Sequence, residues 1–279
     1  MKIGILGDTH LNFNWIAYAL GRFAERGLET IVQTGDLGVW PGERAARGWD
    51  AIDERLAAHG QRILAAPGNH EDYDQIDGLP VDDDGFLVFR DRIRLAPRGH
   101  RSALGDRSVV WLGGAASIDR AHRLEREASG IAPTKEWWAQ EAVNAEDVAR
   151  TVAGGHADIM VSHEGPHGVV ALERRLEEKR PYSAVEDVMY SEHVKHVFTQ
   201  AVHGVKPSLL LHGHYHAHLD AHLAYEDGRA TRIVTLACDG QNGAMGALET
   251  ETLAVEVWDE PVAWGEIKAR LIAHDEWIR

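Results

Sequence analysis

Five short segments of the sequence combine glycine with aspartate, asparagine or histidine directly after an apolar run. Carboxylate, amide and imidazole groups together suit borderline divalent metals such as Zn, Mn or Fe, whereas Mg and Ca prefer shells of oxygen alone. Cys238 is the only cysteine, so a structural zinc site built from thiolates is excluded. The residue types therefore indicate a divalent metal site with mixed ligands. The segments are GDTH (7–10), GD (35–36), GNHE (68–71), SHEG (162–165) and GHYH (213–216).

The apolar runs that precede these segments have the composition of β-strands. Over the first seventy residues, strands alternate with helices, which predicts a parallel sheet in an α/β fold. In open α/β sheets, binding sites form beyond the carboxyl ends of the strands. We therefore expect the five segments to meet at one edge. The elements are strands at 2–7, 30–36, 61–70, 158–166 and 207–216, the last three each ending in a loop, with helices at 14–27 and 43–59.

The rest of the chain predicts shorter strands and three more helices. Residues 86–114 read as short strands separated by Gly, Pro and Asp turns, and residues 218–258 read as antiparallel strands. No change of composition marks a linker, so we expect one domain over residues 1–279, with a variable, cap-like region around 114–156 and 165–205. Helices are predicted at 135–152, 184–203 and 265–276.

In their order along the chain, the five segments resemble the calcineurin-like metallophosphoesterases. The pattern of that superfamily is D-x-H, G-D, G-N-H-[DE], a single His and G-H-x-H, and residues 1–240 carry all of it. The resemblance implies a two-sheet β-sandwich flanked by helices, with two divalent metal ions at the strand ends. The ligand types permit Mn, Fe, Zn, Ni or Co, and we favour Mn.

The resemblance also assigns a role to each motif residue. It implies that a hydroxide bridging the two metals attacks phosphorus while the metals neutralise phosphoryl charge. His70 would be the general acid that protonates the leaving oxygen, or a group that stabilises the transition state. By motif position, Asp8, His10 and His216 would hold one metal, Asn69, His163 and His214 would hold the second, and Asp36 would bridge both.

One segment departs from the Ser/Thr phosphatases of this superfamily. Those enzymes carry GDxxDRG, whereas this chain has GDLGVWPG at 35–42, without the Asp that pairs with the catalytic His or the Arg that binds phosphate. Glu71, Asp72 or Asp119 is then left as the partner of His70. The departure argues against close kinship with eukaryotic-type Ser/Thr phosphatases.

The segment 113–130 concentrates three arginines, Arg120, Arg123 and Arg126. We expect Arg120 to bind substrate, because SIDR follows the end of a predicted strand and arginine can clamp phosphate oxygens. Arg123 and Arg126 fit equally well on a solvated face, paired with Glu125 and Glu127.

The histidine-rich segment 210–223 allows a second interpretation. HAHLDAH at 216–222 resembles the HxHxDH motif of metallo-β-lactamase-type hydrolases, but it has one residue too many between Asp and His. That fold would also leave GDTH and GNHE unexplained. We therefore interpret His218, Asp220 and His222 as one face of a strand that leaves the site.

Charge and composition limit the partners. The formal net charge is −15, and such a field repels the phosphates of duplex nucleic acid, which we do not expect as a partner. No apolar run approaches the roughly eighteen residues that span a bilayer, so we expect no membrane partner. The single cysteine and the absence of a leader-like stretch before residue 2 predict a cytoplasmic protein.

Three functions follow, in order of preference. The first is a phosphomonoesterase acting on a phosphorylated small molecule, a nucleotide or a phosphoprotein. The second is a phosphodiesterase for cyclic nucleotides or nucleic-acid ends, with 113–155 forming a pocket for the second ester arm. The third is a non-catalytic scaffold of the same fold, which comes last because all seven ligand positions and His70 are present.

Overall fold

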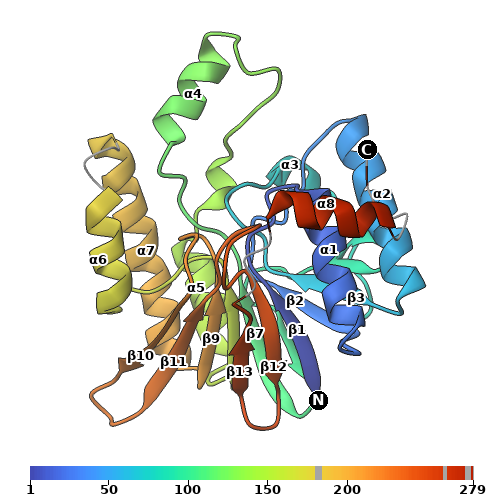
Figure 1. Cartoon of the computed structure of the whole chain (residues 1–279). Coiled ribbons are helices and arrows are strands. Elements are labelled where there is room, and N and C mark those ends of the chain that lie inside the picture. The colour runs from blue at the N-terminus through green and yellow to red at the C-terminus, as the bar shows by residue number, and fades with distance from the viewer. Residues whose placement is uncertain (180–183, 260–262, 274–277, 279) are drawn as a thin grey trace.

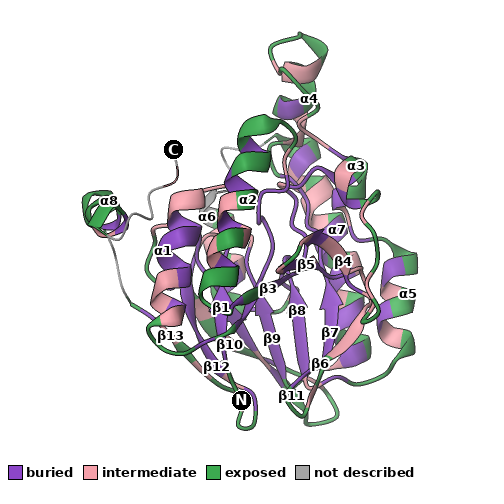
Figure 2. Ribbon diagram, turned by 90° about the vertical axis from the view of Figure 1, so that its right-hand side faces the viewer, coloured by how far each residue is buried: buried purple, intermediate pink, exposed green. Residues whose placement is uncertain are grey.

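The computed structural model describes residues 1–179, 184–259, 263–273 and 278. Two mixed sheets pack face to face and helices cover their outer faces, which confirms the predicted fold class (Figures 1 and 2). The first sheet has the order β13 (Ala254–Val257), β12 (Met245–Glu249), β1 (Lys2–Leu6), β2 (Thr30–Gln33), β3 (Arg62–Ala65), β5 (Ile93–Leu95) and β4 (Leu87–Arg90). The second has the order β10 (Leu219–Ala224), β11 (Ala230–Thr235), β9 (Leu209–His212), β8 (Ile159–Ser162), β7 (Arg107–Leu112) and β6 (Arg101–Leu104).

The central strands of each sheet are parallel. In the first sheet β1, β2, β3 and β5 run in one direction, and in the second β7, β8, β9 and β11 do so. These strands are almost continuously apolar because both of their faces are buried. Alternate side chains of β1 illustrate this: Ile3 and Ile5 pack between the sheets, whereas Leu6 packs toward the helices. The loops after the parallel strands therefore gather at one edge, as the sequence predicts.

Helices complete four layers. The outer face of the first sheet carries α1 (Phe13–Ala24) and α2 (Glu43–Ala58), with α8 (Trp264–Ala273) packed on α1. The second sheet carries α5 (Ala145–Ala153) and α7 (Val185–Val205), with α6 (Val170–Lys179) beside β10. Residues 180–183 of the predicted variable region and 274–276 of the predicted last helix lie outside the described residues. Among the described helices, none combines the length and apolar character needed to cross a bilayer.

The prediction of one helix over 135–152 is wrong at its start. Residues Ala139–Glu141 form a single 3-10 turn, and α5 begins only at Ala145. The Asn144 side chain accepts hydrogen bonds from the backbone of Glu146 and Asp147, and this capping box starts the helix there.

A helix that the sequence did not predict, α4 (Arg120–Ala128), belongs to an arm formed by residues 117–141. The arm projects beyond the strand ends (Figure 1). Its one buried helical side chain is Arg123, so no apolar stripe marks the helix in the sequence.

Candidate metal centre

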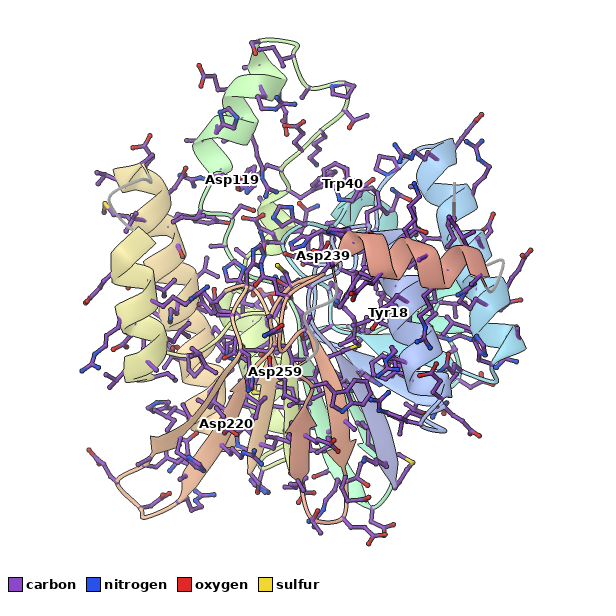
Figure 3. The ribbon with its side chains drawn as sticks, viewed as in Figure 1. Tyr18, Trp40, Asp119, Asp220, Asp239 and Asp259 are labelled. Carbon is purple, nitrogen blue, oxygen red and sulfur yellow. The ribbon has the colours of Figure 1, made fainter. Side chains whose placement is uncertain are left out.

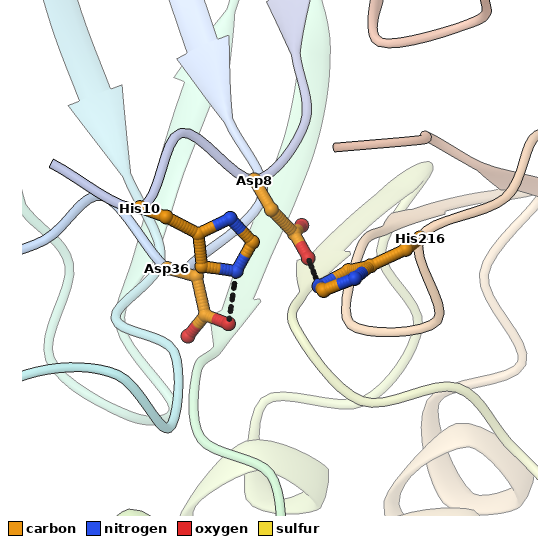
Figure 4. A group of neighbouring side chains, drawn as sticks. All are labelled: Asp8, His10, Asp36 and His216. Carbon is orange, nitrogen blue, oxygen red and sulfur yellow. Dashed lines mark ion pairs between the residues drawn. The ribbon is translucent and has the colours of Figure 1, made fainter. Parts of the chain in front are cut away.

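The loops after five parallel strands bring all the expected ligands to one edge of the sandwich. Four of them lie close enough to share an ion, because one ligand atom from each lies within 4.8 Å of the others (Figure 4). No second group of this kind occurs among the residues that the structure describes. The four are Asp8, His10, Asp36 and His216.

Asp36 lies between histidines of the two expected ligand sets. Its Oδ2 is 3.5 Å from Nε2 of His10 and 3.1 Å from Nε2 of His163. Its other oxygen, Oδ1, accepts a hydrogen bond from the backbone N–H of His70 at 2.8 Å. One carboxylate oxygen thus faces both sets, which is the arrangement that a bridging ligand needs.

The remaining expected ligands surround Asp36 and the two histidines that it faces. Oδ1 of Asn69 is 3.1 Å from Nε2 of His163, and the rings of His163 and His214 are 5.0 Å apart. Nε2 of His216 is 3.3 Å from Oδ2 of Asp8. With bonds of about 2.1 Å to a metal, neighbouring ligand atoms lie about 3.0 Å apart in an octahedral shell and about 3.4 Å apart in a tetrahedral one. The donor types and spacings therefore fit divalent ions.

Hydrogen bonds orient two of the histidines. Nδ1 of His163 donates to the carbonyl of Thr34 at 2.8 Å, and Nδ1 of His10 lies 3.2 Å from Oδ1 of Asp239. These contacts turn Nε2 of both rings toward Asp36. A histidine that binds a metal typically uses its other ring nitrogen for such a contact with an outer partner. Sequence reasoning missed Asp239, although it follows β11 in CDG, the same pattern of strand end, Asp and Gly that marked the other segments.

The electrostatics of the cluster favour positive charge. Burial opposes protonation of His10, but hydrogen bonds to Asp239 and Asp36 raise its pKa to about 10. Burial likewise opposes protonation of His163, and the charges of Asp36 and Asp8 raise its pKa to about 9. Burial also works against the charge of Asp36, yet His163 holds the pKa of that carboxyl well below its usual range. The carboxylates of the cluster thus attract cations.

Backbone strain is concentrated at the same residues. Four expected ligands have positive φ: His10 (45°), Asp36 (53°), His214 (70°) and His216 (51°). They are four of the seven described non-glycine residues with this conformation, each of which costs about 1–2 kcal/mol. Such strain persists where the surroundings impose it, typically at functional sites.

Two motif glycines let carboxylates pack directly on the backbone. A Cβ atom on Gly213 would lie 2.0 Å from Oδ1 of Asp8, and one on Gly68 would lie 2.1 Å from Oδ1 of Asp36. Both distances are shorter than real contacts, so a side chain at either position would displace an expected ligand.

The α4 arm brings an arginine to His70. Nη2 of Arg123 is 2.9 Å from Nε2 and 3.2 Å from Nδ1 of His70, and Nε of Arg123 pairs with Asp119 at 2.9 Å. Arg120, the residue expected to bind substrate, instead pairs with Asp187 on α7 at 3.2 Å and stacks on Tyr190. The arm thus turns Arg123, and not Arg120, toward His70.

The three carboxylates considered as partners of His70 have other contacts. Glu71 accepts hydrogen bonds from the backbone of Leu37, Gly38, Val39 and Gly68, and burial raises its pKa to about 7. Asp72 caps the short helix α3 (Tyr73–Ile76). Asp119 reaches His70 only through Arg123.

Burial lowers the pKa of His70 to about 4, and the charge of Arg123 acts in the same direction. The His70 ring is therefore neutral at neutral pH.

Trp40 lines two pockets beside the candidate centre. Its indole N–H donates to the carbonyl of His70 at 3.0 Å. One pocket, of about 310 Å³, lies on the α4 side, and the other, of about 400 Å³, lies on the His10 side. Trp40, Asp119 and Asp239 lie near the strand ends in Figure 3, whereas Asp220 lies on β10, away from these three residues. The first pocket is lined by Trp40, His70, Asp119, His122, Arg123, Arg126 and Glu136, and the second by His10, Leu11, Phe13, Trp40, Pro41, Arg44 and Ala45.

The other polar residues of the histidine-rich segment leave the centre. His218, Asp220 and His222 are exposed on β10 and directly before it. Asp220 pairs with Arg232 at 2.7 Å, and Nδ1 of His218 donates to the carbonyl of Thr235. These contacts agree with the interpretation of one strand face that leads away from the site.

Comparisons with known proteins give the fold and the family of the chain. The crystal structure of TT1561 of Thermus thermophilus has 12% identity and a TM-score of 0.52, and the match covers 92% of this chain and 98% of that one. Other similar structures are a dimetal phosphatase from Danio rerio (12% identity, 88% and 91% covered, TM-score 0.43) and a novel archaeal phosphodiesterase (14%, 92% and 98%, 0.39). No curated protein matches. The family described as calcineurin-like phosphoesterase matches residues 1–218, and the chain therefore belongs to that family.

Proposed function

We propose that this protein is a dinuclear metal-dependent phosphoesterase that hydrolyses a P–O bond, with phosphomonoesters as its substrates. The observation that carries the proposal is the position of Asp36, whose Oδ2 faces Nε2 of His10 at 3.5 Å and Nε2 of His163 at 3.1 Å. One oxygen between two histidines of different ligand sets suits a pair of ions better than a single ion.

The motif positions divide the ligands between two ions. Bound divalent ions would supply Lewis acidity toward the phosphoryl oxygens and would lower the pKa of the attacking water. The mixed donors suit Mn, Fe, Zn, Ni or Co, with Mn favoured. Asp8, His10 and His216 would hold one ion, Asn69, His163 and His214 the other, and Asp36 both.

His70 and Arg123 would act on the substrate itself. A neutral His70 ring has one N–H, which we assign to the leaving oxygen as a hydrogen-bond donor. Arg123 is held beside it by Asp119 and offers two-pronged contact to phosphoryl oxygens. In this assignment Arg123 replaces the arginine that GDLGVWPG lacks.

The two pockets beside Trp40 favour one alternative. A phosphodiester needs space for a second ester arm, and pockets of about 310 and 400 Å³ share Trp40 in their lining. The second is walled by apolar groups of Phe13 and Trp40, which suit a nucleobase. A phosphodiesterase for cyclic nucleotides or nucleic-acid ends is therefore the second candidate.

The domain organisation, the substrate class and the cellular location are also proposals. We propose that residues 1–279 form one domain in which the α4 arm is the cap-like part. A phosphorylated small molecule, a nucleotide or a phosphoprotein remains the proposed substrate. The cytoplasmic location rests on the single cysteine.

Metal analysis together with two chromogenic substrates tests the proposal. Purified protein would be stripped of metal and reloaded with Mn, and its hydrolysis of p-nitrophenyl phosphate and bis-p-nitrophenyl phosphate would be compared. Two ions per chain with faster monoester hydrolysis is the expected result, and faster diester hydrolysis would select the alternative. Folded protein that binds no metal and hydrolyses neither compound would leave the non-catalytic scaffold.

A further inference from the structure

Asn69 can bind an ion through its side chain only if the amide oxygen, not the nitrogen, faces the centre. A rotation of 180° exchanges the two atoms at almost no steric cost, so a neighbouring group must decide the orientation. In the structure Oδ1 lies 3.1 Å from Nε2 of His163, and Nδ2 donates to Oγ of Ser117 at 3.1 Å. Asn69 is only 4% exposed, so water is a poor substitute for Ser117.

The polarity of Ser117 is in turn set by Glu141. The Ser117 hydroxyl donates to Oε2 of Glu141 at 2.6 Å, and the Ser117 backbone N–H donates to Oε1 at 2.8 Å. A hydroxyl has one hydrogen, so with that hydrogen on Glu141 its oxygen can only accept from Asn69. The chain of donors therefore runs from Asn69 to Ser117 to Glu141, and it fixes which atom of the amide faces His163.

The Ser117–Glu141 pair is itself held rigidly. Both residues are 1% exposed, and they stand at the two ends of the α4 arm. Tyr190 of α7 donates a third hydrogen bond to the Glu141 carboxylate at 3.0 Å. The guanidinium of Arg98 donates to the Glu141 carbonyl and to the hydroxyl of Tyr73, which donates to the carbonyl of Gly68 beside Asn69.

The hydrogen bonds between Ser117 and Glu141 would be enough to close the base of the α4 arm. The additional contact with Asn69 has a different consequence, since it orients a side chain of another loop. We propose that Ser117 and Glu141 are positioning residues that hold the Asn69 amide oxygen toward His163 and thereby set the affinity of the second divalent ion. The inference rests on the proposed dinuclear function and deepens it.

Calorimetric titration of metal-free protein with Mn²⁺ tests this inference without relying on activity. Ser117→Ala removes the acceptor for Asn69. Glu141→Gln keeps the shape but can donate to Ser117, which would reverse the polarity and release the amide. Thr151→Val is the matched control, because it removes another buried hydroxyl, on α5, whose hydrogen bond stays within that helix.

The expected result is that Ser117→Ala and Glu141→Gln each lower the affinity for one of the two Mn²⁺ ions by about 10–100-fold. The affinity for the other ion should stay unchanged. Thr151→Val should bind both ions like the wild type. Unchanged affinities in both folded variants would overturn the inference and leave the proposed function standing. Equal weakening of both ions would also overturn it, since it would indicate general damage. Wild-type protein that binds no Mn²⁺ would overturn the proposed function as well.

Discussion

The guanidinium of Arg123 lies against the ring of His70, with Nη2 2.9 Å from one ring nitrogen and 3.2 Å from the other. The lone-pair directions of the two ring nitrogens diverge, so a single donor cannot bond both in the ring plane. The contact is therefore one of a cation over a neutral ring, made by residues 53 positions apart. It brings fixed positive charge to the one motif histidine that is not an expected ligand.

Arg123→Gln should weaken phosphate binding. Loss of charge-assisted hydrogen bonds costs about 1.5–3 kcal/mol, so the inhibition constant of inorganic phosphate and KM should rise by about 10–100-fold. The control is Arg126→Gln, three residues along α4, whose guanidinium pairs with Glu136 at 2.8 Å. Equal effects of the two substitutions would remove Arg123 from the phosphate site.

His70→Gln should leave the ions bound but slow hydrolysis. The rate should fall by about 10²–10⁴-fold for esters with poor leaving groups and much less for p-nitrophenyl phosphate, because a good leaving group needs little help. Rates for a series of aryl phosphates measure this difference. His122→Gln, in the same pocket, is the control. A uniform loss across the series would contradict a role at the leaving oxygen.

His214→Ala should remove an ion and abolish turnover while the fold persists. The loss of turnover should exceed about a hundredfold, since even outer partners of metal ligands are worth 10–100-fold. Metal content and activity should be compared with those of His218→Ala, which alters an exposed histidine four residues along the same segment. Near-normal turnover of His214→Ala would contradict the ligand assignment.

Gly213→Ala should damage the centre through packing alone. The new Cβ would lie 2.0 Å from Oδ1 of Asp8, and overpacking of this kind costs about 1–3 kcal/mol. We expect lower metal content and a lower Tm. Gly21→Ala is the control, because its Cβ on α1 meets nothing within 4 Å and should stabilise by about 0.5–1 kcal/mol. Full metal content in Gly213→Ala would refute this account of the glycine.

Glu141→Gln should change how stability depends on pH. Burial raises the pKa of Glu141 above its usual value of 4.5, so the folded state binds the proton more tightly than the unfolded state. The contribution of Glu141 is therefore fully present below pH 4.5 and falls as pH rises through the folded pKa.

Urea unfolding in the presence of chelator measures this effect. Above pH 4.5, the free energy of unfolding of the variant should rise relative to that of the wild type. The rise should reach up to about 1.4 kcal/mol per pH unit, until the pH passes the pKa of Glu141 in the folded state. Asp220→Asn is the control, because its hydrogen bond to Arg232 lowers the pKa of Asp220, and its difference from wild type should stay flat between about pH 5 and 8. A flat difference for Glu141→Gln would mean that Glu141 titrates normally.

The sequence was informative where the signal is local. A strand, a glycine and a polar residue at its end are neighbours in the chain, so the sequence alone was enough to place Asp8, Asp36 and His163 at strand ends. Arg123 could not be chosen over Arg120, because α4 has no apolar stripe and its orientation depends on contacts with α7. Ser117 and Glu141 gave no signal, since their role depends on a hydrogen bond across 24 positions.

The expected ligands come from both sheets of the sandwich. Asp8, Asp36 and Asn69 follow strands of the first sheet, and His163, His214 and His216 follow strands of the second. Each bound ion would therefore cross-link the two halves of the protein at one end of their interface. The binding free energy of each ion would therefore also stabilise the packing of one sheet on the other. Removal of the ions would weaken the contact between the two halves of the protein.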